Sequence, residues 1–134
     1  MSRTYRLEFP PGVKLINANG RSSKYAVSAQ SRFARAKVTA ILRSSACLMA
    51  KQMKIPELER VRVKAVYYPP DNRRRDSPNV LFHSSKAVLD GLTDARVWKD
   101  DNDKHVLSLE LVPGDHIVPG GQMVIEIIEV SSGS

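Results

Sequence analysis

The first hydrophobic pattern in the chain is an alternation over residues 3–9, where Tyr5, Leu7 and Phe9 recur at every second position. A period of two predicts a β-strand, because successive strand side chains point to opposite faces. Two prolines and a glycine at 10–12 end this strand. A polar loop follows, in which asparagine and glycine are typical of turns.

The next pattern has the period of a helix. Either Ser28 or Ser31 suits the N-cap, and the periodic segment extends to near Met53, before Pro56 closes it. The apolar residues at helical spacing predict a buried stripe of Ala34, Val38, Ile41, Leu48 and Met49. A second stripe is either a solvated face or a surface that follows a DNA backbone, and it comprises Arg32, Arg35, Thr39 and Arg43.

Alternation returns over residues 60–68, which predicts a second strand that ends at Pro69 and Pro70. Ser77 and Pro78 then match an N-cap followed by proline at the first helical position. The buried face of this second helix is predicted to consist of Leu81, Val88, Leu92 and Ala95. A different face is predicted to carry Asn79, His83, Lys86 and Asp90.

The last third of the chain contains two more alternating segments, 105–112 and 123–130, joined by a loop rich in proline and glycine. They predict two strands, for which we expect a hairpin with a long loop. The order β-α-β-α-β-β predicts a single α+β domain with a mixed sheet and two main helices. We assign residues 1–130 to this domain and expect residues 131–134 to form a disordered tail.

The composition favours a polyanionic binding partner. Lysine and arginine exceed the acidic residues by 7 in a chain of 134 residues. This balance favours a nucleic-acid partner, although a basic protein without one has the same composition. The single cysteine, Cys47, leaves no disulfide framework and fits a reducing compartment. No signal peptide or membrane-spanning run is evident, so we expect a cytoplasmic protein without a membrane partner.

Candidate chemistry is concentrated on both sides of the second predicted helix. Three arginines run directly into Asp76, and a second acidic pair, Asp100 and Asp101, follows the helix. Carboxylates suit Mg²⁺, and arginine forks match phosphate oxygens. The pattern therefore indicates metal-assisted phosphodiester chemistry, while a solvated turn and a polar loop would use the same residues. His105 follows closely, and we expect it to be structural because the histidines lack metal-ligand spacing.

Residues 72–101 carry a family pattern. In order, it consists of Asn72, Arg73-Arg74-Arg75-Asp76, Asn79, Lys86, Asp90-Gly91-Leu92 and Trp98-x-Asp100-Asp101. This set resembles the RusA family of Holliday junction resolvases, and Phe9-Pro10-Pro11 with the asparagines after it is similar to the N-terminal loop of that family. The resemblance covers roughly the whole chain. It implies a homodimeric, Mg²⁺-dependent endonuclease of bacteria and their phages, acting on four-way DNA junctions in the cytoplasm of a bacterium or a phage-infected host.

The resemblance also assigns roles to individual side chains. It implies that Asp76 and Asp101 are catalytic and hold Mg²⁺, for which Mn²⁺ is a possible substitute, with Asp100 and Asn79 as further ligands. Lys86 is implied to be catalytic as well. DNA contacts are implied for residues of two loops, namely Arg73, Arg74, Arg75, Asn17, Asn19, Arg21 and Lys24.

The chain departs from the family pattern at one position. Where relatives often carry a second carboxylate two positions after the first, this chain has Pro78, and the segment up to Lys86 is about one helical turn longer. Asn79 offers only a neutral carbonyl oxygen in its place. The resemblance implies a resolvase that nicks junctions in pairs during recombination, repair or phage DNA processing. The alternative is a non-catalytic junction-binding protein that has lost a metal-binding carboxylate.

Overall fold

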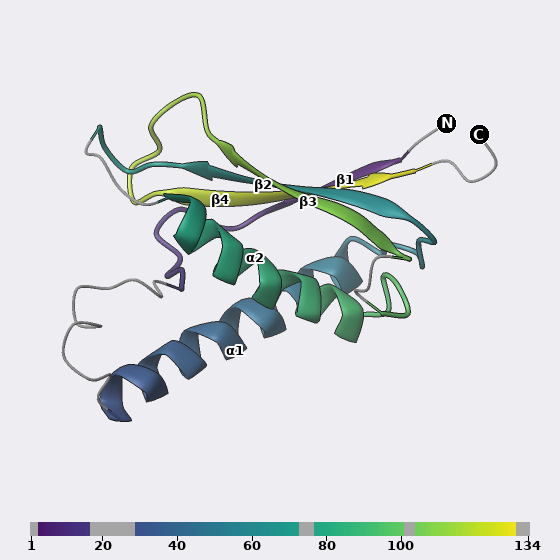
Figure 1. The fold of residues 1–134 in the computed structure, drawn as a ribbon, viewed down its shortest axis with the longest axis horizontal. Coiled ribbons are helices and arrows are strands. Elements are labelled where there is room, and N and C mark those ends of the chain that lie inside the picture. The colour runs from purple at the N-terminus through teal and green to yellow at the C-terminus, as the bar shows by residue number, and fades with distance from the viewer. Residues whose placement is uncertain (1–2, 17–28, 73–76, 101–103, 131–134) are drawn as a thin grey trace.

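The computed structural model describes residues 3–16, 29–72, 77–100 and 104–130, which form one sheet with two helices on the same face (Figure 1). The elements in chain order are β1 (Thr4–Glu8), α1 (Ala29–Gln52), β2 (Val61–Tyr68), α2 (Ser77–Asp94), β3 (Val106–Pro113) and β4 (Gln122–Glu129). This order confirms the predicted α+β fold. Neither helix has the length and apolarity needed to cross a membrane in the described part of the chain.

The sheet has the strand order β1-β4-β2-β3. β2 and β3 are parallel neighbours, and α2 connects them, because two parallel strands require a long crossover rather than a tight turn. β4 lies in the middle and runs antiparallel to both β1 and β2. The sheet is therefore mixed, as the sequence predicts.

The predicted hairpin of the last two strands is wrong, because β2 lies between β3 and β4. The loop from Gly114 to Gly121 crosses the C-terminal end of β2, where Val118 donates its N–H to the Pro69 carbonyl at 3.0 Å. A side chain at Gly114 would collide with the ring of Tyr68, so glycine is required at this crossing. The length of the loop, which is unusual for a hairpin, reflects the strand that it passes.

The core lies between the sheet and the helices, and α2 buries the face that its sequence predicts. Leu81, Val88 and Leu92 are each at most 2% exposed, and Ala95 packs against them. α1 behaves differently. Its fully buried residues are Leu42, Ala46 and Ala50.

The predicted buried stripe of α1 is therefore partly wrong. Val38 and Met49 are half-buried, but Ala34 is exposed, and Ile41 and Leu48 are 51% and 60% exposed. A close helix crossing explains the shift, because Gly91 of α2 lies against the Arg43 carbonyl and Ala46 of α1. Backbones approach this closely only where side chains are small, so alanines occupy the contact face. α1 begins at Ala29, which leaves Ser31 inside the helix and rules it out as the N-cap.

Candidate active site

The first candidate cluster follows the C-terminal end of β2. Pro69 and Pro70 lead the chain to Asp71, which is half-buried, and to Asn72, which is exposed. α2 begins at Ser77, within one residue of the predicted cap. The intervening predicted residues Arg73, Arg74, Arg75 and Asp76 lie outside the described residues, as do Asn17, Asn19, Arg21 and Lys24. Their roles stay predictions.

The predicted polar face of α2 is confirmed for three residues. Lys86 is exposed, and His83 and Asp90 are half-buried, whereas Leu81, Val88 and Leu92 on the core face are buried. Asn79 lies in the first turn of the helix. At about 1.5 Å per residue, Lys86 is about 13 Å along the axis from Ser77.

The second candidate cluster lies at the N-terminal end of β2. Leu58 donates its N–H to the Val97 carbonyl at 2.6 Å, and Val61 donates to the His105 carbonyl at 2.7 Å. These bonds hold the segment between α2 and β3 beside the start of β2. Asp100 belongs to this segment and is exposed. Asp101 and Asp103 lie outside the described residues.

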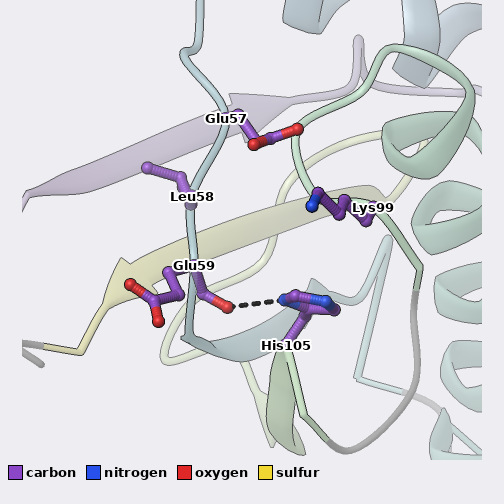
Figure 2. Close-up of a pocket in the computed structure, with 5 residues that line it drawn as sticks. All are labelled: Glu57, Leu58, Glu59, Lys99 and His105. Atoms are coloured by element: carbon purple, nitrogen blue, oxygen red, sulfur yellow. Dashed lines mark hydrogen bonds between the residues drawn. The ribbon is translucent and has the colours of Figure 1, made fainter.

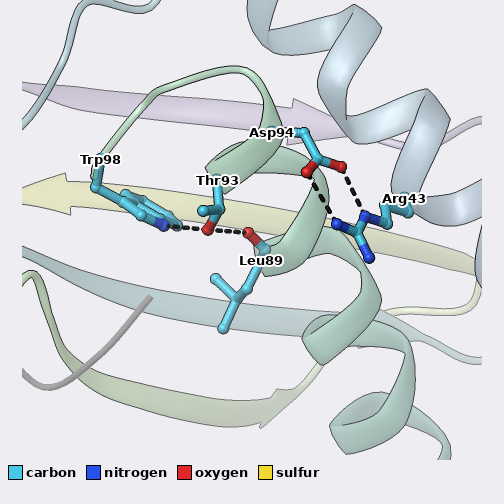
Figure 3. A network of polar contacts seen from close by, with 5 residues as sticks. All are labelled: Arg43, Leu89, Thr93, Asp94 and Trp98. Atoms are coloured by element: carbon cyan, nitrogen blue, oxygen red, sulfur yellow. Dashed lines mark hydrogen bonds and ion pairs between the residues drawn. The ribbon is translucent and has the colours of Figure 1, made fainter. Parts of the chain in front are cut away.

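Trp98 fastens this segment to the end of α2 (Figure 3). Its ring is 1% exposed, and its Nε1–H donates to the Thr93 hydroxyl at 2.7 Å, which in turn donates to the Leu89 carbonyl at 3.0 Å. An indole N–H buried without a partner would be costly, so this chain of donors fixes the ring orientation. Trp98 therefore packs against the end of α2.

A bidentate ion pair ties the same end of α2 to α1 (Figure 3). Arg43 donates to the two carboxylate oxygens of Asp94 at 2.6 and 2.9 Å. The hydrogen bonds from Arg43 lower the pKa of the Asp94 carboxyl below its usual value. Arg43 therefore has a partner within the chain, although its side chain is 51% exposed, and a contact of the predicted basic stripe with DNA stays a prediction.

His105 lies in a pocket of about 440 Å³ beside the second cluster, with Glu57, Leu58, Glu59 and Lys99 (Figure 2). Its Nδ1 is 2.7 Å from the Glu59 carbonyl oxygen, and because a carbonyl only accepts, Nδ1 is the donor. This bond gives Nδ1 of His105 a partner, as expected of a structural histidine. In the part of the chain that the structure describes, no three His, Cys, Asp or Glu side chains are grouped as a metal site.

The two clusters lie at opposite ends of the fold. β2 has 8 residues, so at about 3.3 Å per residue its ends are about 23 Å apart. α2 has 18 residues and is about 27 Å long. Within one chain, the structure therefore does not bring Asp100 near Asp71 or Asn72. The order of residues in the sequence does not predict this separation, because it does not show to which end of the sheet the chain returns after α2.

Arg6 is a basic residue near the first cluster that the sequence indicates only as part of a strand. A hydrogen bond between Arg6 and the Tyr68 side chain raises the pKa of the Arg6 guanidinium. Arg6 lies on β1 and Tyr68 on the end of β2, so the contact crosses the intervening β4. The order of the strands in the sheet brings this cation to the end of β2. The alternating hydrophobic pattern of the sequence does not predict that order.

Comparison with known proteins finds a relative that aligns along nearly the whole chain. No protein-family model matches the sequence. The chain is 31% identical over 126 residues to the crossover junction endodeoxyribonuclease rusA of Enterobacteria phage HK97, and the alignment covers 94% of this chain and 93% of the phage protein. Both proteins are therefore comparable over nearly their whole length, including both candidate clusters.

Proposed function

Because the chain belongs to the RusA family, we propose that it resolves four-way DNA junctions by paired nicking of two strands in a Mg²⁺-dependent reaction. The observation that carries this proposal is the similarity to the phage HK97 crossover junction endodeoxyribonuclease along 94% of the chain. The excess of 7 basic residues supports a polyanionic substrate. The reaction serves recombination, repair or phage DNA processing, in the cytoplasm of a bacterium or a phage-infected host, and residues 1–130 form the nuclease domain.

The symmetry of the substrate suggests a homodimer. A four-way junction has approximate two-fold symmetry, and paired nicking cuts two strands that this symmetry relates. A dimer with C₂ symmetry presents two equivalent sites in the matching arrangement. One chain with one site would have to release and rebind the junction between its two cuts.

The separation of the two clusters bears on the metal. Asp76 and Asp101 lie outside the described residues, but Asp76 is bonded to Ser77 at the start of α2 and Asp101 to Asp100 in the segment after it, with about 3.8 Å between neighbouring Cα atoms. Metal–oxygen bonds are only about 2.1 Å long for Mg²⁺. To take both carboxylates from one chain, one ion would have to bridge a span comparable to the length of β2, about 23 Å. We propose that each site combines Asp76 of one chain with Asp101 of the other.

The chemistry follows from these groups. A bound Mg²⁺ would lower the pKa of a water ligand and stabilise charge on the scissile phosphate. Arg73, Arg74 and Arg75 bind the phosphates on both sides of the cleaved bond, since guanidinium forks suit phosphate oxygens. Lys86 is exposed on α2, and we assign it to the attacking water or to the developing oxyanion.

A non-catalytic junction-binding protein is the second candidate function, and Pro78 is the observation that favours it. The proline side chain has no oxygen to bind a metal, so the site lacks one carboxylate of the family pattern. The basic surface and the dimer would still serve to bind a junction. Asp100 or Asp103 compensates for the loss if the chain is an active nuclease.

The deciding experiment is a nicking assay on a synthetic four-way junction across a titration of Mg²⁺ and Mn²⁺. We expect the unmodified chain to cleave, and Asp76→Asn and Asp101→Asn each to abolish cleavage while retaining junction binding. Glu126→Gln, in the middle of β4, is the matched control and should cleave normally. Cleavage that survives in both aspartate variants would overturn the metal assignment. Tight binding with no cleavage in either metal would establish the non-catalytic alternative.

A further inference from the structure

Three large apolar side chains of α1 are exposed along one line of the helix. Phe33 is 74% exposed, Ile41 is 51% exposed and Leu48 is 60% exposed. At about 100° per residue, Phe33 and Ile41 are about 80° apart around the helix axis, and Leu48 lies between them. A single exposed apolar side chain is ordinary, whereas several in line mark a contact surface. We call these three residues the α1 stripe.

The α1 stripe points away from the rest of the fold. The fully buried residues of α1 are Leu42, Ala46 and Ala50, and the middle of the stripe is about 180° from Ala46 around the helix axis. Figure 1 shows α1 in the helical layer on one face of the sheet, with α2 beside it. The elements that the structure describes therefore leave the stripe uncovered.

The spacing of the α1 stripe suits a helix as its occupant. Ile41 and Leu48 are seven residues apart, which is the repeat with which one helix follows another, and Ala34 extends that repeat toward the N-terminus. From Phe33 to Leu48 the stripe is about 22 Å long. A helix that lies in a membrane surface buries a broader apolar face, and here Lys37 interrupts the sector between Phe33 and Ile41.

The charge of α1 determines which helix can bind there. Residues 29–54 contain 6 lysines and arginines and no acidic residue. Lys37 lies within the α1 stripe and Lys51 lies beside it, and both are exposed. A second copy would place Lys37 against Lys37 in a parallel pair, and against Lys51 in an antiparallel pair centred between them, so like charges oppose self-pairing. A partner helix with acidic flanks is attracted instead.

We propose that the α1 stripe binds an acidic, amphipathic helix of a different protein. The apolar side chains of that helix pack on the stripe, and its carboxylates lie beside Lys37 and Lys51, which is a common mode of helix recognition. A DNA backbone suits the stripe less well, because phosphate contacts require cationic or polar groups where Ile41 and Leu48 stand. No residue of the stripe belongs to either candidate cluster, so the inference does not depend on the proposed nuclease function.

The first test measures binding to a synthetic acidic helix. The probe is a fluorescein-labelled peptide of three heptads, with leucine at positions a and d and glutamate at e and g, whose own acidic flanks oppose its self-pairing. Fluorescence anisotropy should show binding to the full chain. The double variant Ile41→Gln, Leu48→Gln should raise the dissociation constant at least about tenfold, because two apolar contacts are lost. Ile117→Gln is the matched control, since Ile117 is 41% exposed in the loop before β4, and it should bind normally.

The second test exchanges charges. Lys37→Glu should weaken binding of the glutamate peptide severalfold and strengthen binding of a matched peptide with lysine at e and g. Arg62→Glu, an exposed position on β2, makes the same change of charge away from the stripe and should alter neither affinity. At about 0.15 M salt, charges farther apart than about 8 Å are largely screened, so only the local change matters. Circular dichroism checks that every variant is folded.

Each outcome supports the proposal or overturns it. A glutamate peptide that does not bind, or that binds the double variant equally well, overturns it, and so does equal binding of the lysine peptide by the unmodified chain. A dimer of the unmodified chain that the double variant dissociates, measured by sedimentation equilibrium, assigns the stripe to a second copy instead. Binding to vesicles of phosphatidylserine and phosphatidylcholine, without binding to the peptide, assigns it to a membrane surface. None of these measurements involves junction cleavage, so an inactive nuclease leaves the proposal intact.

Discussion

Mixing two inactive variants is a direct test of whether each active site draws on two chains. Asp76→Asn and Asp101→Asn should each be inactive alone, because every site in either homodimer lacks one carboxylate. In a mixed dimer, one site collects both substitutions and the other collects neither. Mixing should therefore restore cleavage, which two sites confined to single chains could not do.

The size of the restored activity follows from counting sites. Random exchange of equal amounts makes about half of the dimers mixed, and one of the two sites in each mixed dimer is intact. About a quarter of all sites should therefore work, giving about a quarter of the unmodified nicking rate on junctions. Paired nicking needs two intact sites in one dimer, so resolution into two duplexes should stay near zero.

The assay follows nicked and fully resolved products separately on junctions labelled on two arms, after the mixed variants have equilibrated. Each variant alone, at the same total concentration, gives the background. A third mixture, of unmodified chain with Asp76→Asn, checks that subunits exchange. If subunits exchange but the Asp76→Asn and Asp101→Asn mixture nicks no faster than its background, the two-chain site is wrong.

Further predictions address DNA binding, the metal and stability. Log affinity for junctions should fall linearly with log salt, by about 0.9 for each phosphate contact on duplex arms, and a salt-independent affinity would contradict phosphate-dominated binding. Arg74→Ala should weaken junction binding in a filter or gel assay and leave the melting temperature nearly unchanged, whereas the reverse would make the arginine run structural. Pro78→Asp should lower the Mg²⁺ concentration that half-maximal cleavage needs, with Pro78→Asn as the uncharged control, since aspartate is favourable in a first helical turn. Arg43→Gln should lower the melting temperature slightly at pH 7. Because Arg43 lowers the pKa of Asp94 in the folded state, this stabilisation is lost as the pH falls below about 4, and the two melting temperatures should converge there.

Periodicity predicts the elements of this fold well because each buries one face. Leu81, Val88 and Leu92 show the helical spacing of α2 directly. The same reasoning selects the wrong face of α1, where Ile41 and Leu48 are exposed and Ala46 and Ala50 are buried. Hydrophobicity ranks leucine above alanine, but a close crossing with Gly91 favours small side chains. A pattern within one helix contains no information about the distance to the next helix.

The candidate site shows a similar limit. Residue type and order in the sequence single out the acidic and basic residues between Asn72 and Asp100, and their roles stay predictions. The near full-length similarity to the phage protein supports the family alone. Spacing in sequence does not predict that α2 places its two ends about 27 Å apart. The acidic residues before and after α2, which the sequence suggests as ligands of one metal ion, then belong to segments at opposite ends of that helix.

The central position of β4 has a consequence for how the chain folds. β4 is synthesised after β1, β2 and β3, yet it forms hydrogen bonds with both β1 and β2. Until it emerges from the ribosome, the first strand has no neighbour and the βαβ unit exposes an unpaired apolar edge. Contacts of such long sequence separation form slowly, because the intervening chain must be ordered first. A nascent chain that stalls just before Gln122 would therefore expose unpaired strand edges, which can pair with other chains, and would be prone to aggregation.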